Sequence, residues 1–124
     1  MSTKRILIVE DERLARISLA EFLRDRGYEI AVATDGESAI EIQQDHPFDV
    51  CIVDIRMPGM GGDEAILRLY QIAPDSRFII YTGSPQFALS PALKELGLSE
   101  HDIVRKPVLD MGVFVALIDP ENLS

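Results

Sequence analysis

A chain of 124 residues corresponds to one domain, and 47% hydrophobic residues is enough to build a core. Its net charge of −9 disfavours binding to nucleic acid or to an anionic membrane. There is no apolar run of membrane-spanning length and no signal-peptide pattern, so we expect a soluble, cytoplasmic protein without direct nucleic-acid or membrane partners. The single cysteine, Cys51, is expected to be a buried core thiol in a reducing compartment.

The apolar run at residues 6–9 predicts a first buried strand, which ends in three acids, Glu10, Asp11 and Glu12. A helix is expected over about residues 12–26, with Asp11 able to cap its start and Gly27 beyond its end. Apolar residues at helical spacing form the expected stripe of this helix: Leu14, Ile17 (or Ser18), Phe22 and Leu23.

A second strand with partial alternation is expected at residues 28–33. Asp35 or Gly36 then opens a short helix, which the pair His46-Pro47 stops because proline disfavours helix at the preceding residue.

The chain is organised around residues 50–60, where an apolar run ends in a single carboxylate, Asp54. The strand that delivers Asp54 is expected over about residues 48–53. Its β-branched residues predict a strand buried on both faces. A Pro/Gly loop at residues 57–62 follows, and then a helix over about residues 63–72.

The region after the fourth expected strand, residues 78–81, is the least regular. Ser84 and Ser90 each precede a proline, which is typical of an N-cap followed by the first helical residue. The pattern fits either one helix broken near Ser90 or a short helix that starts there and ends at Leu96-Gly97.

A fifth strand at residues 102–104 leads to the pair Lys106-Pro107, and a last short helix is expected at residues 110–118. Strand and helix therefore alternate five times with short connections, which favours a doubly wound (βα)5 α/β fold. We expect a parallel sheet of order 2-1-3-4-5 in a single domain covering residues 1–124, with no output domain in this chain.

Polar side chains follow four of the five strands, at the edge of the sheet where ligands bind in open α/β folds. Two carboxylates about 5 Å apart repel by roughly 3 kcal/mol at an effective dielectric near 20, so the acids need a partner that offsets their charge. Mg²⁺ suits such an oxygen-rich site and is the expected cofactor. The residues that this edge brings together are Glu10, Asp11, Asp54, Thr82 and Lys106.

Taken singly, Asp11 reads as a helix cap, Thr82 as a turn residue and Lys106 as a solvated charge; their joint placement indicates function. We expect Asp54 to be a nucleophile that accepts a phosphoryl group. Asp11, Asp54 and the backbone carbonyl of Arg56 are the expected direct metal ligands. Glu10 is expected to orient a metal-bound water. Lys106 and Thr82 are expected to contact phosphoryl oxygens.

The chain resembles the receiver domains of two-component response regulators over about residues 4–118. The motifs that carry the resemblance are residues 6–12, 54–62, 82–83 and 106–107. The resemblance implies that a histidine kinase or phosphotransfer protein donates to Asp54, and that the chain catalyses only its own phosphorylation and dephosphorylation. It also implies that Thr82 then moves and reshapes the face of the fourth helix, fifth strand and fifth helix for a downstream effector. Side chains that tune dephosphorylation in the family correspond to Arg56 and Ser84 here.

Two departures from the family pattern make this signalling face atypical. Ile103 stands where the family usually has the aromatic partner of the threonine, and residues 98–102 replace a shorter Gly-Ala turn.

The last helix has one apolar face, which could meet a partner or a second copy in a homodimer, or be no more than a poorly charged helix end. The residues of this face are Met111, Phe114, Val115 and Ile118.

Two other functions fit part of the pattern. A Mg²⁺-dependent phosphatase would use the same acids, but such hydrolases usually carry a second acid at the position of Arg56 and a cap domain. A constitutive interaction or dimerisation module would explain Ile103 and the apolar last helix. His46 and His101 are expected to be surface residues rather than phosphorelay histidines.

Overall fold

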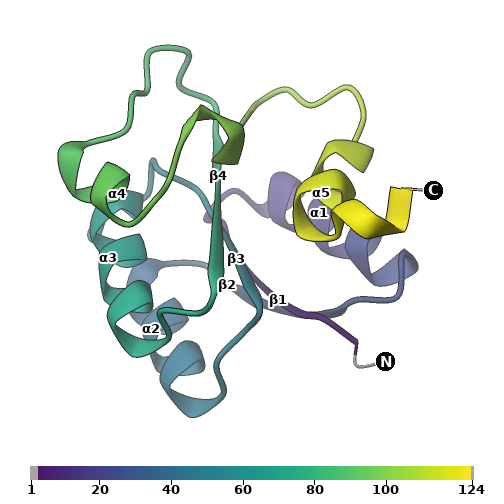
Figure 1. The fold of residues 1–124 in the computed structure, drawn as a ribbon, viewed down its shortest axis with the longest axis horizontal. Coiled ribbons are helices and arrows are strands. Elements are labelled where there is room, and N and C mark those ends of the chain that lie inside the picture. Colours follow the sequence, from purple (N-terminus) through teal and green to yellow (C-terminus); the bar gives the residue numbers. More distant parts are fainter. Residues whose placement is uncertain (1–2, 124) are drawn as a thin grey trace.

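The computed structural model describes residues 3–123 and contains a five-stranded parallel sheet of order β2-β1-β3-β4-β5 (Figure 1). Every neighbouring pair of strands is parallel. The expected doubly wound α/β fold is thereby confirmed. The strands are β1 (Arg5–Val9), β2 (Glu29–Ala33), β3 (Val50–Val53), β4 (Arg77–Thr82) and β5 (Ile103–Arg105).

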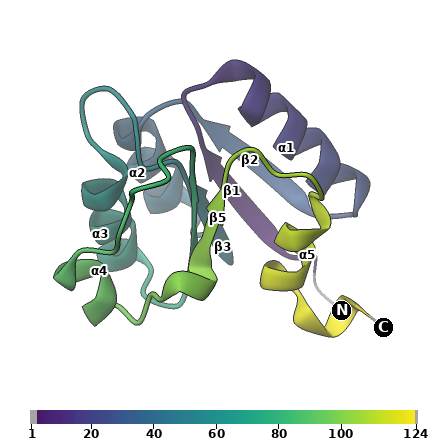
Figure 2. The same cartoon turned by 90° about the horizontal axis from the view of Figure 1, so that it is seen from above.

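Helices cover both faces of the sheet, with α1 and α5 on one side and α2, α3 and α4 on the other (Figure 2). Two short 3-10 turns, η1 (Glu100–Asp102) and η2 (Pro120–Leu123), complete the chain. Within residues 3–123, no helix is long and apolar enough to cross a membrane. The helices are α1 (Arg13–Asp25), α2 (Gly36–Asp45), α3 (Gly62–Ile72), α4 (Pro91–Glu95) and α5 (Gly112–Ile118).

Alternation along the strands divides the core into two apolar clusters. Ile8 and Ile52 contribute to the cluster beneath α1 and α5, whereas Val9 and Val53 contribute to the one beneath α2, α3 and α4. Cys51 belongs to the second cluster, is fully buried, and has its pKa raised to about 12 by that burial. The thiol is therefore a neutral core group, as expected from its neighbours in the sequence.

The apolar stripe predicted for α1 is wrong at its N-terminal end. Leu14 is 74% exposed and Ile17 is 37% exposed. The side chains that face the sheet are Leu19, Ala20 and Leu23, so only the second half of the helix packs on the core. With 3.6 residues per turn, Leu14 and Ile17 lie on the side of the helix turned away from Leu19, Ala20 and Leu23.

Two of the four side-chain caps expected from the sequence are present at helix starts. Asp35 caps α2 by accepting the Ser38 N–H at 2.7 Å, and this bond holds the pKa of Asp35 below its ordinary value. Ser90 caps α4 by accepting the Leu93 N–H, which selects the short helix starting at Ser90. The prediction that Asp11 caps α1 is wrong, because Glu12 holds that position without a side-chain bond.

The apolar face of the last helix lies inside the protein. Phe114, Val115 and Ile118 are buried in the first cluster, and the Phe114 ring meets the edge of Tyr81 at a centroid distance of 5.1 Å. Intramolecular packing therefore accounts for the run of uncharged residues in α5. Leu109, just before the helix, is fully exposed.

The pair Ser84-Pro85 starts no helix: residues 83–90 form a loop between β4 and α4. Ile103, at the position of the usual aromatic, is half-buried against the second cluster. His46 and His101 are both exposed, as expected.

Candidate functional site

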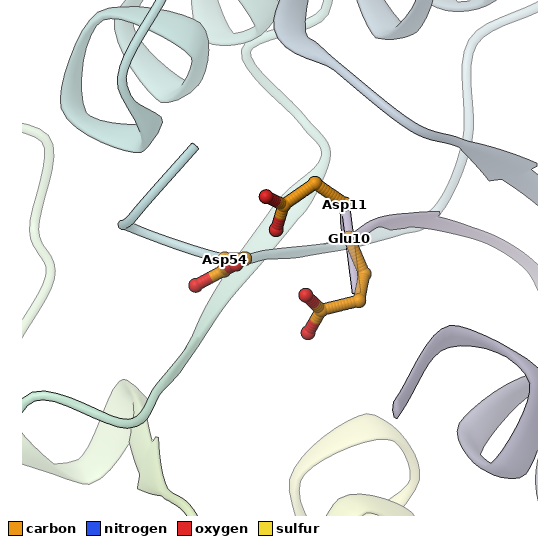
Figure 3. A group of neighbouring side chains, drawn as sticks. All are labelled: Glu10, Asp11 and Asp54. Atoms are coloured by element: carbon orange, nitrogen blue, oxygen red, sulfur yellow. The ribbon is translucent and has the colours of Figure 1, made fainter. Parts of the chain in front are cut away.

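The carboxyl ends of β1 and β3 bring the predicted acids together. Val9 and Val53 are paired in register, and the Asp54 N–H donates to the Val9 carbonyl at 2.9 Å. Each of Glu10, Asp11 and Asp54 offers a carboxylate oxygen, and these oxygens all lie within 4.8 Å of one another (Figure 3). The sheet order alone was enough to predict this convergence, because β1 and β3 are the neighbours between which the strand order reverses.

Gly62, the first residue of α3, packs against the backbone of Asp54 and Ile55 and so lets the chain turn back into the helix. A Cβ at Gly62 would lie 2.4 Å from the Asp54 carbonyl oxygen and 2.6 Å from the Ile55 Cα. Real Cβ atoms do not approach backbone atoms so closely, so only glycine allows the first turn of α3 to pack against this loop. The Gly62 N–H also donates to the Ile55 carbonyl at 3.0 Å, which fixes the position of the loop that follows Asp54.

Asp54, the predicted nucleophile, is only 4% exposed. Burial, followed by the hydrogen bond and the negative charge of Glu10, raises the pKa of Asp54 from 3.8 to about 7. The charge of Lys106 and the Arg56 N–H, which donates to Asp54 Oδ1 at 3.1 Å, partly oppose this shift.

Lys106 reaches the same place from the end of β5. Its Nζ lies 2.7 Å from Glu10 Oε1 and 4.8 Å from the centroid of the Tyr81 ring. Burial opposes the charged ammonium, but the hydrogen bond and charge of Glu10, together with Asp54, leave the pKa of Lys106 raised. The pairing between Lys106 and Glu10 was not anticipated from the sequence, which placed both residues at this edge without joining them.

Glu10 is almost fully buried, and its second oxygen accepts the Glu12 N–H at 3.1 Å. Arg16, one turn into α1, donates to the backbone carbonyls of Glu10 and Asp11 at 3.1 and 3.4 Å. The sequence analysis did not identify Arg16. An arginine five positions after Asp11, near the start of the expected helix, was the signal that could have indicated a contact to this loop. These contacts hold the loop after β1 so that its two acids keep their relative positions.

The acids open onto a cleft of about 450 Å³ lined by Asp11, Glu12, Asp54, Arg56, Gly83 and Lys106. Thr82 is not among the lining residues. It is fully buried at the end of β4, and its Oγ1 accepts the Ser84 N–H at 3.0 Å. Four of the predicted residues therefore line one cleft, Glu10 lies beneath it, and Thr82 lies behind it.

The donor set of the cleft suits a hard cation. Three carboxylates and one ammonium carry a net charge of 2 − when all four groups are ionised. Oxygen ligands are those that Mg²⁺ and Ca²⁺ prefer. The acidic cluster could therefore hold a divalent metal, and such an ion would offset the remaining negative charge of the three carboxylates.

Residues 6–119 match the family profile of the response regulator receiver domain. Among curated relatives, a response regulator receiver protein of Anaeromyxobacter is 36% identical over 85% of this chain and 43% of its own length. The chemotaxis protein CheY of Thermotoga maritima is 32% identical over 92% of this chain and 94% of its own length. Sporulation initiation phosphotransferase F of Bacillus subtilis is 34% identical over 82% of each chain.

The fold comparison agrees with the sequence comparison. A CheY-like receiver domain from Methanospirillum hungatei superimposes with a TM-score of 0.83 and 26% identity, over 96% of this chain and 93% of that one. Several curated relatives are longer proteins, and this chain spans 43%, 30% and 52% of three of them. The chain belongs to the response regulator receiver family, the signalling modules of two-component systems and phosphorelays.

Proposed function

We propose that the chain accepts a phosphoryl group on Asp54 from the phosphohistidine of a histidine kinase or phosphotransfer protein. The observation that carries this proposal is the position of Asp54, a buried carboxylate that opens onto the cleft beside Asp11 and Lys106. In the transfer, an Asp54 oxygen forms a bond to phosphorus as the P–N bond breaks, and its electron pair stays on the donor's imidazole.

Mg²⁺ is the cation proposed for the acidic cluster. Asp11 and Asp54 would ligate it through carboxylates and Arg56 through its backbone carbonyl, while Glu10 would orient a metal-bound water. When bound, the ion supplies positive charge that offsets the acids and the phosphoryl oxygens. Asp54 must be ionised to attack, so a nearby cation favours the reactive form of a carboxylate whose pKa is otherwise raised.

Lys106 is proposed to bind a phosphoryl oxygen. Its ammonium already lies at the cleft, held by Glu10 at 2.7 Å, and the Lys106 N–H donates to the Thr82 carbonyl at 2.8 Å. A new anionic group on Asp54 would compete with Glu10 for this ammonium. Thr82 would contact another oxygen after its side chain leaves the buried position behind the cleft.

The output is proposed to be a rearrangement of the face formed by α4, β5 and α5, read by a downstream effector protein or domain. This face carries exposed Leu109 and Val113. The two alternatives are less well supported. Arg56 stands where a phosphatase would need a second acid, and the buried face of α5 removes one of the two reasons for a constitutive interaction module.

The test is incubation with phosphoramidate and Mg²⁺ followed by intact-mass measurement. We expect one added phosphoryl group on the native chain, none on Asp54→Asn, and loss of the addition when EDTA replaces Mg²⁺. Asp45→Asn, which changes an exposed acid at the end of α2, is the matched control and should react like the native chain. Equal labelling of Asp54→Asn and the control would contradict the proposal.

A further inference from the structure

The side chain of Arg105 joins the end of β5 to the loop between β4 and α4. Its Nη1 donates to the Ser84 carbonyl at 3.0 Å, and its Nη2 donates to the Phe87 carbonyl at 3.1 Å. A planar guanidinium has parallel donors at a fixed separation, so it can hold two carbonyls at once. The same Nη2 also lies 3.5 Å from the exposed Glu100 carboxylate, which is a weaker contact.

This loop has few other ties. Residues 83–90 contain no helix or strand, and the loop's own turn is closed by a Phe87 N–H···Ser84 carbonyl contact of 3.4 Å. Within residues 3–123, its hydrogen bonds to a strand other than β4 are the two from Arg105. Phe87 and Leu89 add apolar packing against the second cluster. The conformation of the loop therefore depends strongly on one side chain.

The same contacts extend to Thr82. The Ser84 N–H donates to Thr82 Oγ1 at 3.0 Å, while the Ser84 carbonyl accepts from Arg105. Ser84 is thus held on both sides, and Thr82 is held in its buried position behind the cleft. Before the Thr82 hydroxyl can reach a group on Asp54, its hydrogen bond from the Ser84 N–H has to break, or Ser84 has to move with it.

We propose that Arg105 is a positioning residue that holds the loop after β4 in its resting arrangement and thereby slows phosphorylation of Asp54. This inference rests on the proposed function of Asp54. The hydrogen bonds of Arg105 go to Ser84, Phe87 and Glu100 rather than to the acids of the cleft, so it acts through Ser84 and Thr82. The Thr82 hydroxyl can contact a phosphoryl oxygen on Asp54 only in an arrangement in which Ser84 has released it. A contact made only in the resting arrangement reduces the population of that second arrangement.

The test compares initial rates of phosphorylation by phosphoramidate at saturating Mg²⁺. We expect Arg105→Ala to react about three- to tenfold faster than the native chain, because the population of the competent arrangement rises. Arg105→Lys should be intermediate, since one ammonium cannot match the two-carbonyl geometry of the guanidinium. Arg68→Ala, which removes another paired surface arginine on α3, should stay within about twofold of the native rate. Loss of positive charge alone would slow capture of an anionic donor, so charge cannot explain an acceleration.

A second measurement separates positioning from a purely structural role. In amide NMR spectra without donor, the Ser84 and Phe87 signals of Arg105→Ala should shift toward their positions in the phosphorylated native chain. Rates of Arg105→Ala and Arg68→Ala that are equal, or a slower Arg105→Ala, would overturn the role of Arg105 while leaving Asp54 as the acceptor. Failure of the native chain to be phosphorylated would instead overturn the proposed function and this role with it.

Discussion

The two halves of the functional edge are built differently. The acid half, which consists of residues 10–12 and 54–62, is fixed by buried side chains and by backbone contacts to the sheet, with Glu10 and Asp54 both less than 5% exposed. The loop half, which consists of residues 83–90 and 107–111, contains no buried residue. Arg105 ties its first segment to β5. Segments with few buried contacts open at low free-energy cost. We therefore expect chemistry in the acid half and movement in the loop half.

The largest expected effect is at Phe114 in α5, the helix that directly follows residues 107–111 of the loop half. Phe114 is fully buried and packs edge-on against Tyr81, so Phe114→Ala should lower the free energy of unfolding by about 3–5 kcal/mol. Val113→Ala, on the exposed side of the same helix, should change it by less than about 1 kcal/mol. Urea denaturation measures both. Similar losses for the two variants would mean that α5 is not anchored through the face that the structure buries.

Gly62→Ala tests how tightly the acid half is packed. The added Cβ meets two backbone atoms that have little room to move, so we expect a loss of about 1–3 kcal/mol together with slower phosphorylation of the displaced Asp54. Gly61→Ala is a close control, because the nearest atom to its Cβ would be 4.0 Å away. If both alanine variants unfold at the same urea concentration, the close approach behind Asp54 is not a constraint.

The raised pKa of Asp54 predicts a pH-dependent stability in metal-free buffer. The folded chain keeps the Asp54 proton up to about pH 7, whereas the unfolded chain releases it near its ordinary pKa of 3.8. Between these values the folded state binds more protons, so the free energy of unfolding falls as the pH rises.

Asp54→Asn removes this titration while keeping the Oδ1 acceptor for the Arg56 N–H. Relative to this variant, the native chain should lose up to about 4 kcal/mol between about pH 4 and 7 and little more above that range. Urea melts at several pH values in EDTA measure the difference. Parallel pH profiles of the two chains would show that Asp54 does not titrate with a raised pKa.

The smallest expected effect is at the exposed end of the loop half. Leu109 is 100% exposed, so Leu109→Ser should change the free energy of unfolding by less than about 0.5 kcal/mol. A thermal melt is sufficient to test this. A clear loss of stability would show that Leu109 packs against the protein, and that the loop half makes more buried contacts than we describe.

Much of the fold could be predicted because its strands are short apolar runs separated by helices with recognisable caps. The end of β3 and the sheet order place Asp54 beside Glu10, so the acid half was predicted almost completely. Asp11 was partly misread, because an acid before a helix fits both a cap and a ligand.

Contacts between residues far apart in the chain could not be predicted from local patterns. The pairing of Lys106 with Glu10 joins residues 96 positions apart, and the bond from Arg105 to Ser84 spans 21. Leu14 and Ile17 are exposed because they lie on the side of α1 away from its buried face, and the sequence alone did not show which side of this helix would meet the sheet. The loop half therefore needed the structure, while the acid half followed from strand order.

The most direct test of Asp54 as the phosphoryl acceptor is to locate the phosphoryl group by tandem mass spectrometry after reaction with a phosphohistidine donor and Mg²⁺. We expect one group per chain, on Asp54, and no transfer to Asp54→Asn. A group found on another residue of the native chain, or undiminished transfer to Asp54→Asn, would contradict the claim that the acid half carries the chemistry.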